Sequence, residues 1–137
     1  MEHTGVYRRT RKSLGQGSKV DIFLNADSRE LLNKLLSSTD LSQKSLASIF
    51  TMTEKTFSNH RNNDRKLSPL IAELAIKIME LYEEGKQTFG SLKNFNRWMT
   101  NPAPGLNHRL PLDLIQTVTG VELVMDELKA IEFGAPV

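Results

Sequence analysis

The sequence contains no cysteine, and no apolar run approaches the roughly 20 residues that a membrane-spanning helix needs. The first absence excludes disulfides, thiolate metal sites and redox chemistry on sulfur. The N-terminal segment MEHTGVYRRTRK also lacks the apolar stretch of a secretory signal. We therefore expect a cytoplasmic protein without a membrane partner. An apolar fraction of 39% and a charged fraction of 25% are typical of an ordinary globular chain.

Groupings that would indicate an enzyme or a metal site are missing as well. His3, His60 and His108 lie far apart in the sequence, without the pairing one helical turn apart that metal sites use. Gly15 and Gly17 are not set between a strand and a helix, as a phosphate-binding loop requires. We expect no catalytic activity, no metal and no cofactor.

Charge is distributed unevenly although the net charge is only +2. Before Asp21 five basic residues accompany a single acid, whereas from Leu112 onward five acids accompany a single base. The early basic residues are Arg8, Arg9, Arg11, Lys12 and Lys19. Residues 1–27 are therefore interpreted as a flexible basic arm that could follow a DNA backbone. A solubilising tail explains such a short terminal charge run equally well.

After residue 27 the apolar positions recur with the period of an α-helix, and no strand pattern of any length appears. The sequence predicts an all-α fold: a helix-turn-helix-containing bundle over residues 28–86, then a small helical domain over residues 87–137. Upstream, Val20–Leu24 is apolar and could be either a strand or a packed extended segment.

Serine, proline and glycine residues mark the expected starts and ends of the predicted helices. Ser68 and a following proline are expected to open the long helix of the first unit, and Gly85 is expected to end it. In the second unit, Pro111 is expected to begin a short helix that Gly120 breaks before the last helix starts. Gly134 is expected to close that last helix as a left-handed C-cap.

The segment Leu41–Asn62 has the spacing of a helix-turn-helix, a unit whose second helix enters the DNA major groove. Ser42 and Thr53 are predicted to cap its two helices, with Thr51 and Met52 forming the turn between them. The motif usually has a glycine where this chain has Thr51, which indicates a slightly different turn or a motif kept for packing alone.

Polar side chains on the outer face of this segment suit base edges and phosphates. The residues predicted to contact DNA are Gln43, Thr53, Lys55, Ser58, Asn59, Arg61, Asn62, Arg65 and Lys66. The same pattern also fits two short amphipathic helices that serve only to pack a helical core.

The run from Phe95 to Gly134 resembles the toxin-binding domain of the Xre/MbcA/ParS family of bacterial antitoxins. The elements that carry the resemblance are Trp98, the proline loop 101–105, Leu106, Arg109, Pro111–Ile115, Gly120, Val124, Leu128, Ile131 and Gly134. Members of the family usually carry glycines just before the loop arginine, where this chain has Asn107 and His108.

The resemblance implies an antitoxin that occludes the active site of a cognate toxin and represses its own operon, usually as a dimer bound to operator DNA. In such pairs the toxin is often a RES-type enzyme that consumes NAD. The residues implied in toxin binding are Arg109, Phe133, Gly134, Ala135, Pro136 and Val137. A short apolar tail is plausible as a plug because docking it orders few residues. The alternative is a stand-alone helix-turn-helix regulator whose C-terminal half mediates dimerisation.

Overall fold

The computed structural model describes residues 28–63 and 65–137, and these residues form six α-helices and two short 3-10 helices. The elements are α3 (Ser28–Thr39), α4 (Gln43–Ile49), α5 (Glu54–Asn62), α6 (Pro69–Phe89), α7 (Leu92–Met99), η1 (Pro104–Leu106), η2 (Pro111–Leu114) and α8 (Val118–Glu132). In the described ranges the β-type pairing is an isolated bridge between Ala103 and Arg109. The all-α prediction is confirmed. The predicted basic arm, with its segment Val20–Leu24, lies outside the described residues.

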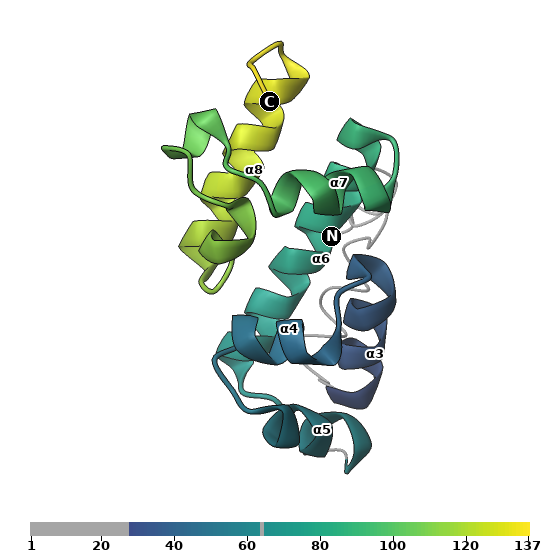
Figure 1. Cartoon of the computed structure of the whole chain (residues 1–137). Helices are drawn as coiled ribbons and strands as arrows, with labels where there is room; N and C mark the ends of the chain where they lie inside the picture. Colours follow the sequence, from purple (N-terminus) through teal and green to yellow (C-terminus); the bar gives the residue numbers. More distant parts are fainter. Residues whose placement is uncertain (1–27, 64) are drawn as a thin grey trace, which may run out of the picture.

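Helix α6 is the central element, and α3, α7 and α8 each pack against it (Figure 1). Nine of its residues are buried, a pattern typical of a helix that is covered on more than one side. The apolar core is continuous from α3 through α6 to α8. The predicted domain boundary after residue 86 falls inside α6, so the two predicted units share this helix. Along the described ranges, no helix combines the length and apolar character needed to cross a membrane.

The predicted helix caps lie where the sequence indicated them. Ser42, Thr53 and Ser68 each precede a helix, and each side-chain oxygen accepts a hydrogen bond from a backbone N–H in the first helical turn. Pro69 then occupies the first helical position of α6, where its missing N–H costs no hydrogen bond. These three caps set the start of α4, α5 and α6.

The prediction that Gly85 ends the long helix is wrong. Helix α6 continues to Phe89, and Gly90 closes it in a left-handed conformation with φ of 86°. Gly85 is needed for a different reason, because a Cβ atom at this position would overlap the buried ring of Phe95 on α7. The glycine lets two helices approach closely.

The prediction that Gly120 separates two helices is also wrong. Pro111 opens only the 3-10 turn η2, and Gly120 lies inside the first turn of α8. Its N–H donates to Oγ1 of the capping Thr117 over 3.0 Å. A Cβ atom here would overlap the carbonyl oxygen of Leu114, so the glycine permits η2 to turn back onto α8.

This close approach predicts the effect of Gly120→Ala. The added methyl group meets backbone rather than a flexible side chain, and we expect the free energy of unfolding to fall by about 1–3 kcal/mol. Chemical denaturation followed by circular dichroism measures this loss. The neighbouring exposed variant Thr119→Ala is the control and should change stability by less than about 0.5 kcal/mol. Equal stabilities of the two variants would contradict the packing role.

Candidate nucleic-acid and partner interfaces

The turn between α4 and α5 forms without glycine. Thr51 has φ of 59°, in the left-handed region that glycine adopts most easily. The N–H of Met52 donates to the carbonyl oxygen of Ala47 over 2.9 Å, which closes the turn. The expectation of a different turn is therefore wrong at Thr51, because its backbone has the conformation that a glycine would supply.

Helix α5 lies at one end of the molecule (Figure 1), anchored by the fully buried Phe57. Lys55 and Asn62 are exposed on this helix, and Arg65 and Lys66 are exposed just after it. Their side chains are therefore accessible to a polyanion.

Two other predicted DNA contacts have structural partners. The Thr53 hydroxyl oxygen accepts the N–H of Thr56 over 3.0 Å, which caps α5. The carboxamide oxygen of Asn59 accepts a hydrogen bond from Asn63 over 3.1 Å. Capping α5 is therefore a structural role for Thr53. The contacts of Thr53 and Asn59 with DNA remain predictions.

Three of the predicted DNA residues hydrogen-bond to one another. Nε2 of Gln43 donates to Oγ of Ser58 over 2.6 Å, and Oε1 of Gln43 accepts from Nη1 of Arg61 over 3.2 Å. Nε of Arg61 donates to Oδ1 of Asn33 on α3 over 2.7 Å. We call Asn33, Gln43, Ser58 and Arg61 the guanidinium network. It joins α3, α4 and α5 through polar side chains at the surface.

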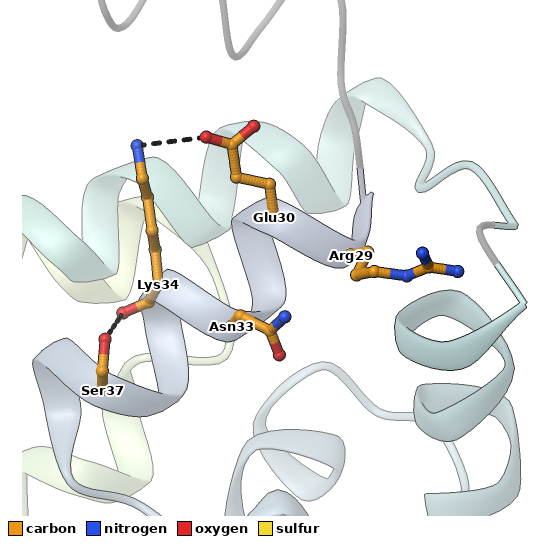
Figure 2. Close-up of a pocket in the computed structure, with 5 residues that line it drawn as sticks. All are labelled: Arg29, Glu30, Asn33, Lys34 and Ser37. Carbon is orange, nitrogen blue, oxygen red and sulfur yellow. Dashed lines mark hydrogen bonds and ion pairs between the residues drawn. The ribbon is translucent and has the colours of Figure 1, made fainter.

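Helix α3 also fixes the end of α5. Arg29 donates from Nε and Nη2 to the carbonyl oxygens of Arg61 and Asn62, over 3.1 and 2.9 Å. A cation beside the last carbonyls of a helix is favourable because those oxygens have no partner within the helix. In Figure 2, Arg29 and Asn33 extend to one side of α3, away from the 3.7 Å ion pair between Glu30 and Lys34.

The segment after α5 is tied down by two further contacts. The carbonyl oxygen of Arg65 lies 2.7 Å from the hydroxyl of Ser28 and 2.6 Å from Nδ1 of His60. Because that oxygen is an acceptor, His60 donates from Nδ1. The contact gives His60 a structural role in fixing the backbone that carries Arg65.

Sequence reasoning missed Arg29 and Asn33 as part of this surface. They lie one helical turn apart on the polar side of an amphipathic helix, which the sequence alone could show. Their partners are about 30 positions away in the sequence, and only the fold brings them together.

The second candidate surface begins where α8 ends. The N–H groups of Gly134 and Ala135 donate to the carbonyl oxygens of Ile131 and Ala130, both over 3.0 Å. These bonds, with φ of 109° at Gly134, form a Schellman motif. The predicted closure of the last helix by Gly134 is confirmed.

This C-cap leaves an apolar tail in solvent. The Phe133 side chain is 91% exposed and that of Val137 is 62% exposed, while Ala135 is half-buried and Pro136 is exposed. Because the Phe133 side chain buries so little surface, it contributes little to the stability of the fold. Its apolar surface is available to a partner.

Arg109 lies in a separate loop. Asn107 and His108, which precede it, have φ of 56° and 62°, so both adopt the left-handed conformation that glycines would favour. The backbone of Arg109 accepts the N–H of Ala103 over 3.0 Å, and its side chain is exposed. The structure does not record a contact between Arg109 and the tail.

A carboxyl pair links α6 to the last turn before the tail. The pKa of Glu84 is raised, first because its carboxyl group hydrogen-bonds to that of Glu132 and then because it is partly buried. The pKa of Glu132 is lowered by the same hydrogen bond and by the Thr88 hydroxyl, which donates to it over 2.5 Å. These opposite shifts favour a state in which the protonated carboxyl group of Glu84 donates its hydrogen to the ionised carboxylate of Glu132.

Residues 85–134 match a family model described as the antitoxin Xre/MbcA/ParS C-terminal toxin-binding domain. This part of the chain is therefore similar to the toxin-binding domain of that family, and we refer to residues 85–134 as the Xre/MbcA/ParS domain. This confirms the resemblance drawn from the sequence, and it agrees with the expectation that the protein is not an enzyme. The Xre/MbcA/ParS domain begins inside α6 and includes α7, both 3-10 helices and α8.

Antitoxin Xre from Yersinia enterocolitica is 28% identical over 81 residues, which are 58% of this chain and 55% of that protein. The chain thus spans about half the length of this curated relative. Among solved structures, a chain of the M. tuberculosis MbcT–MbcA toxin–antitoxin complex is similar, with a TM-score of 0.63 and 16% identity. That similarity covers 80% of this chain and 96% of the other, and it shows a shared fold.

In the Xre/MbcA/ParS domain, Trp98 packs in the interior, as expected for a large aromatic residue. It is 7% exposed and stacks on Phe95 with ring centroids 5.8 Å apart. The described part of the chain gathers no three histidine or carboxylate side chains that could hold a metal ion.

The carboxyl pair predicts a pH dependence. Because the pKa of Glu84 is raised, this residue stabilises the folded state at pH values below the ordinary glutamate pKa. That stabilisation is lost as the pH rises through the raised pKa. Because the pKa of Glu132 is lowered, this residue stabilises the folded state at pH values above the ordinary glutamate pKa. That stabilisation is lost as the pH falls through the lowered pKa. The link between α6 and α8 should therefore be tightest near pH 4.5, between the two shifted values.

We expect Glu84→Gln to reduce the change in melting temperature between pH 4.5 and pH 7.5, because an amide N–H donates to Glu132 at both values. Thermal unfolding followed by circular dichroism measures the effect. The control Glu83→Gln removes a carboxylate from the same helix outside the pair and should keep the wild-type pH dependence. If Glu84→Gln also keeps it, the shared proton has no part in stability.

Proposed function

We propose that the protein is the antitoxin of a type II toxin–antitoxin pair and acts in the cytoplasm. Its C-terminal domain binds a cognate toxin and occludes the active site with the tail Phe133–Val137. The observation that carries the proposal is the 91% exposure of Phe133 at the end of a domain that matches toxin-binding domains.

The geometry of the tail supports occlusion. The Schellman motif fixes the direction in which the chain leaves α8, so only the residues beyond it must become ordered when a partner binds. Burying a phenylalanine side chain contributes about 1.5–3 kcal/mol, enough for a dominant contact in a small interface. Arg109, whose side chain is exposed on the loop after η1, would add a cationic contact to the toxin.

We further propose that the toxin is a RES-type enzyme that consumes NAD. Support comes from the family of the C-terminal domain and from the similarity to a chain of a toxin–antitoxin complex. An apolar plug can exclude substrate without contributing any chemistry of its own. The antitoxin therefore needs no metal, cofactor or catalytic group.

We propose that α4 and α5 form a helix-turn-helix that represses the protein's own operon, with the chain bound to operator DNA as a homodimer. The supporting features are the short turn at Thr51, the two capped helices and the exposed cations Lys55, Arg65 and Lys66. In Figure 1, α5 and the C-terminal tail lie at opposite ends of the molecule. This separation allows DNA and toxin to be bound at the same time.

Phe133→Ala tests the toxin-binding surface. Co-expressed with the product of the neighbouring gene, the wild-type chain should co-purify with it, lower its NAD consumption and restore growth. Because Phe133 is almost fully exposed, the variant should keep wild-type stability while its affinity for the toxin falls at least tenfold, as for a buried aromatic anchor.

The matched control is Leu70→Ala, which shortens another exposed apolar side chain, 70% exposed at the start of α6 and outside the matched domain. It should inhibit the toxin as the wild type does. A stand-alone regulator would form no stable complex with the neighbouring product. Equal inhibition by Phe133→Ala and the wild type would show that the tail is not the plug.

Lys55→Gln tests the DNA-binding surface. If Lys55 contacts a phosphate, the variant should bind DNA from upstream of its own gene more weakly. The slope of log affinity against log salt should also become shallower by about 0.9. Fluorescence anisotropy over a range of salt concentrations measures both quantities. Lys93→Gln, the same charge change at an exposed position on α7, should leave the slope unaltered. Equal slopes for all three proteins would contradict the assigned surface.

A further inference from the structure

Arg61 is the centre of the guanidinium network, and its side chain is half-buried. Its Nε donates to Asn33 over 2.7 Å and its Nη1 donates to Gln43 over 3.2 Å. Because a guanidinium group only donates, both carboxamides must turn their oxygen atoms toward it. The amide nitrogen of Gln43 then points at Ser58, to which it donates over 2.6 Å. The orientation of each side chain in the network follows from its neighbour.

The two bonds use two of the five N–H groups of Arg61. The remaining three belong to Nη1 and Nη2, the edge of the guanidinium with the fork geometry that matches two oxygens of a phosphate. An arginine already held through Nε and Nη1 needs to lose little side-chain freedom when its remaining N–H groups bind a ligand. Both partners of Arg61 are neutral amides, so they orient the guanidinium group without neutralising its charge. The contacts thus fit an arginine positioned to bind a phosphate better than one in an internal ion pair.

Asn33 is well placed to hold the guanidinium group of Arg61 in this orientation. It lies on α3, and the neighbouring Leu32 and Leu35 are fully buried in the core. One turn earlier, Arg29 donates hydrogen bonds to the carbonyl oxygens of Arg61 and Asn62. Helix α3 therefore fixes both the backbone and the side chain of Arg61 from a rigid element.

We propose that Asn33 is a positioning residue for DNA binding, which presets Arg61 for a contact with one backbone phosphate. This inference rests on the proposed DNA-binding function and adds α3, which lies outside the helix-turn-helix, to the DNA-binding unit. Asn33 acts through Arg61 and does not itself touch the DNA. Gln43 is the second support of the same guanidinium group, although it was predicted from the sequence as a DNA contact.

A double-mutant cycle tests the proposal with DNA from upstream of the protein's own gene. Arg61→Ala should weaken binding and flatten the salt slope by about 0.9. Asn33→Ala should weaken binding by about threefold to tenfold, the effect of losing one hydrogen bond that orders a charged group. In the double variant, Asn33→Ala should add nothing to Arg61→Ala. Ser37→Ala, an exposed change on α3 outside the network, should bind as the wild type does.

A spectroscopic measurement separates positioning from a loss of fold. The Nε–H resonance of Arg61 should be sharp and protected from exchange in the wild type and should broaden in Asn33→Ala, with the backbone spectrum and melting temperature unchanged. Wild-type affinity of Asn33→Ala, with Arg61→Ala still weakened, would overturn the positioning role and leave the DNA-binding function intact. A further loss in the double variant would also overturn it, because Asn33 would then contact DNA directly. Absence of specific binding by the wild type would overturn both.

Discussion

The structure depends on the burial of α6 from several sides. Nine of its residues are buried, and α3, α7 and α8 each pack against it. One close contact is the ring of Phe95 against Gly85, where any larger residue would hold α7 away. Phe95 in turn meets Tyr82 edge-on at 5.0 Å and stacks on Trp98. One helix therefore connects α3 to α7 and α8 in a fixed relation.

Local signals of the sequence are sufficient for the parts of the fold that depend on local physics. Ser42, Thr53 and Ser68 were predictable as caps because a hydroxyl before a helix satisfies a backbone N–H within three residues. Gly85 and Gly120 were misread for the opposite reason. Each is required by a group on another element, and a glycine that permits close approach has the same sequence signal as one that ends a helix.

The candidate sites show the same limit. Periodicity placed Ser58 and Arg61 on the outer face of a helix, and the family resemblance supplied the tail. Neither could show that Arg61 is held by Asn33, 28 positions earlier, because amphipathicity indicates which side is polar and not which polar groups meet. Exposure of Phe133 was likewise not predictable, since an apolar residue at a helix end is as often packed as free. Only tertiary structure distinguishes the two cases.

Both proposed interfaces lie beside backbone that is strained in the same way. Thr51 precedes the predicted recognition helix, and Asn107 and His108 precede Arg109; all three have φ between 56° and 62°. For residues with a Cβ atom this conformation costs on the order of 1 kcal/mol, and most for the β-branched Thr51. Each turn is closed by a hydrogen bond to a buried alanine, Ala47 in the first and Ala103 in the second. The core therefore sustains this strain and fixes the two loops beside the proposed interfaces.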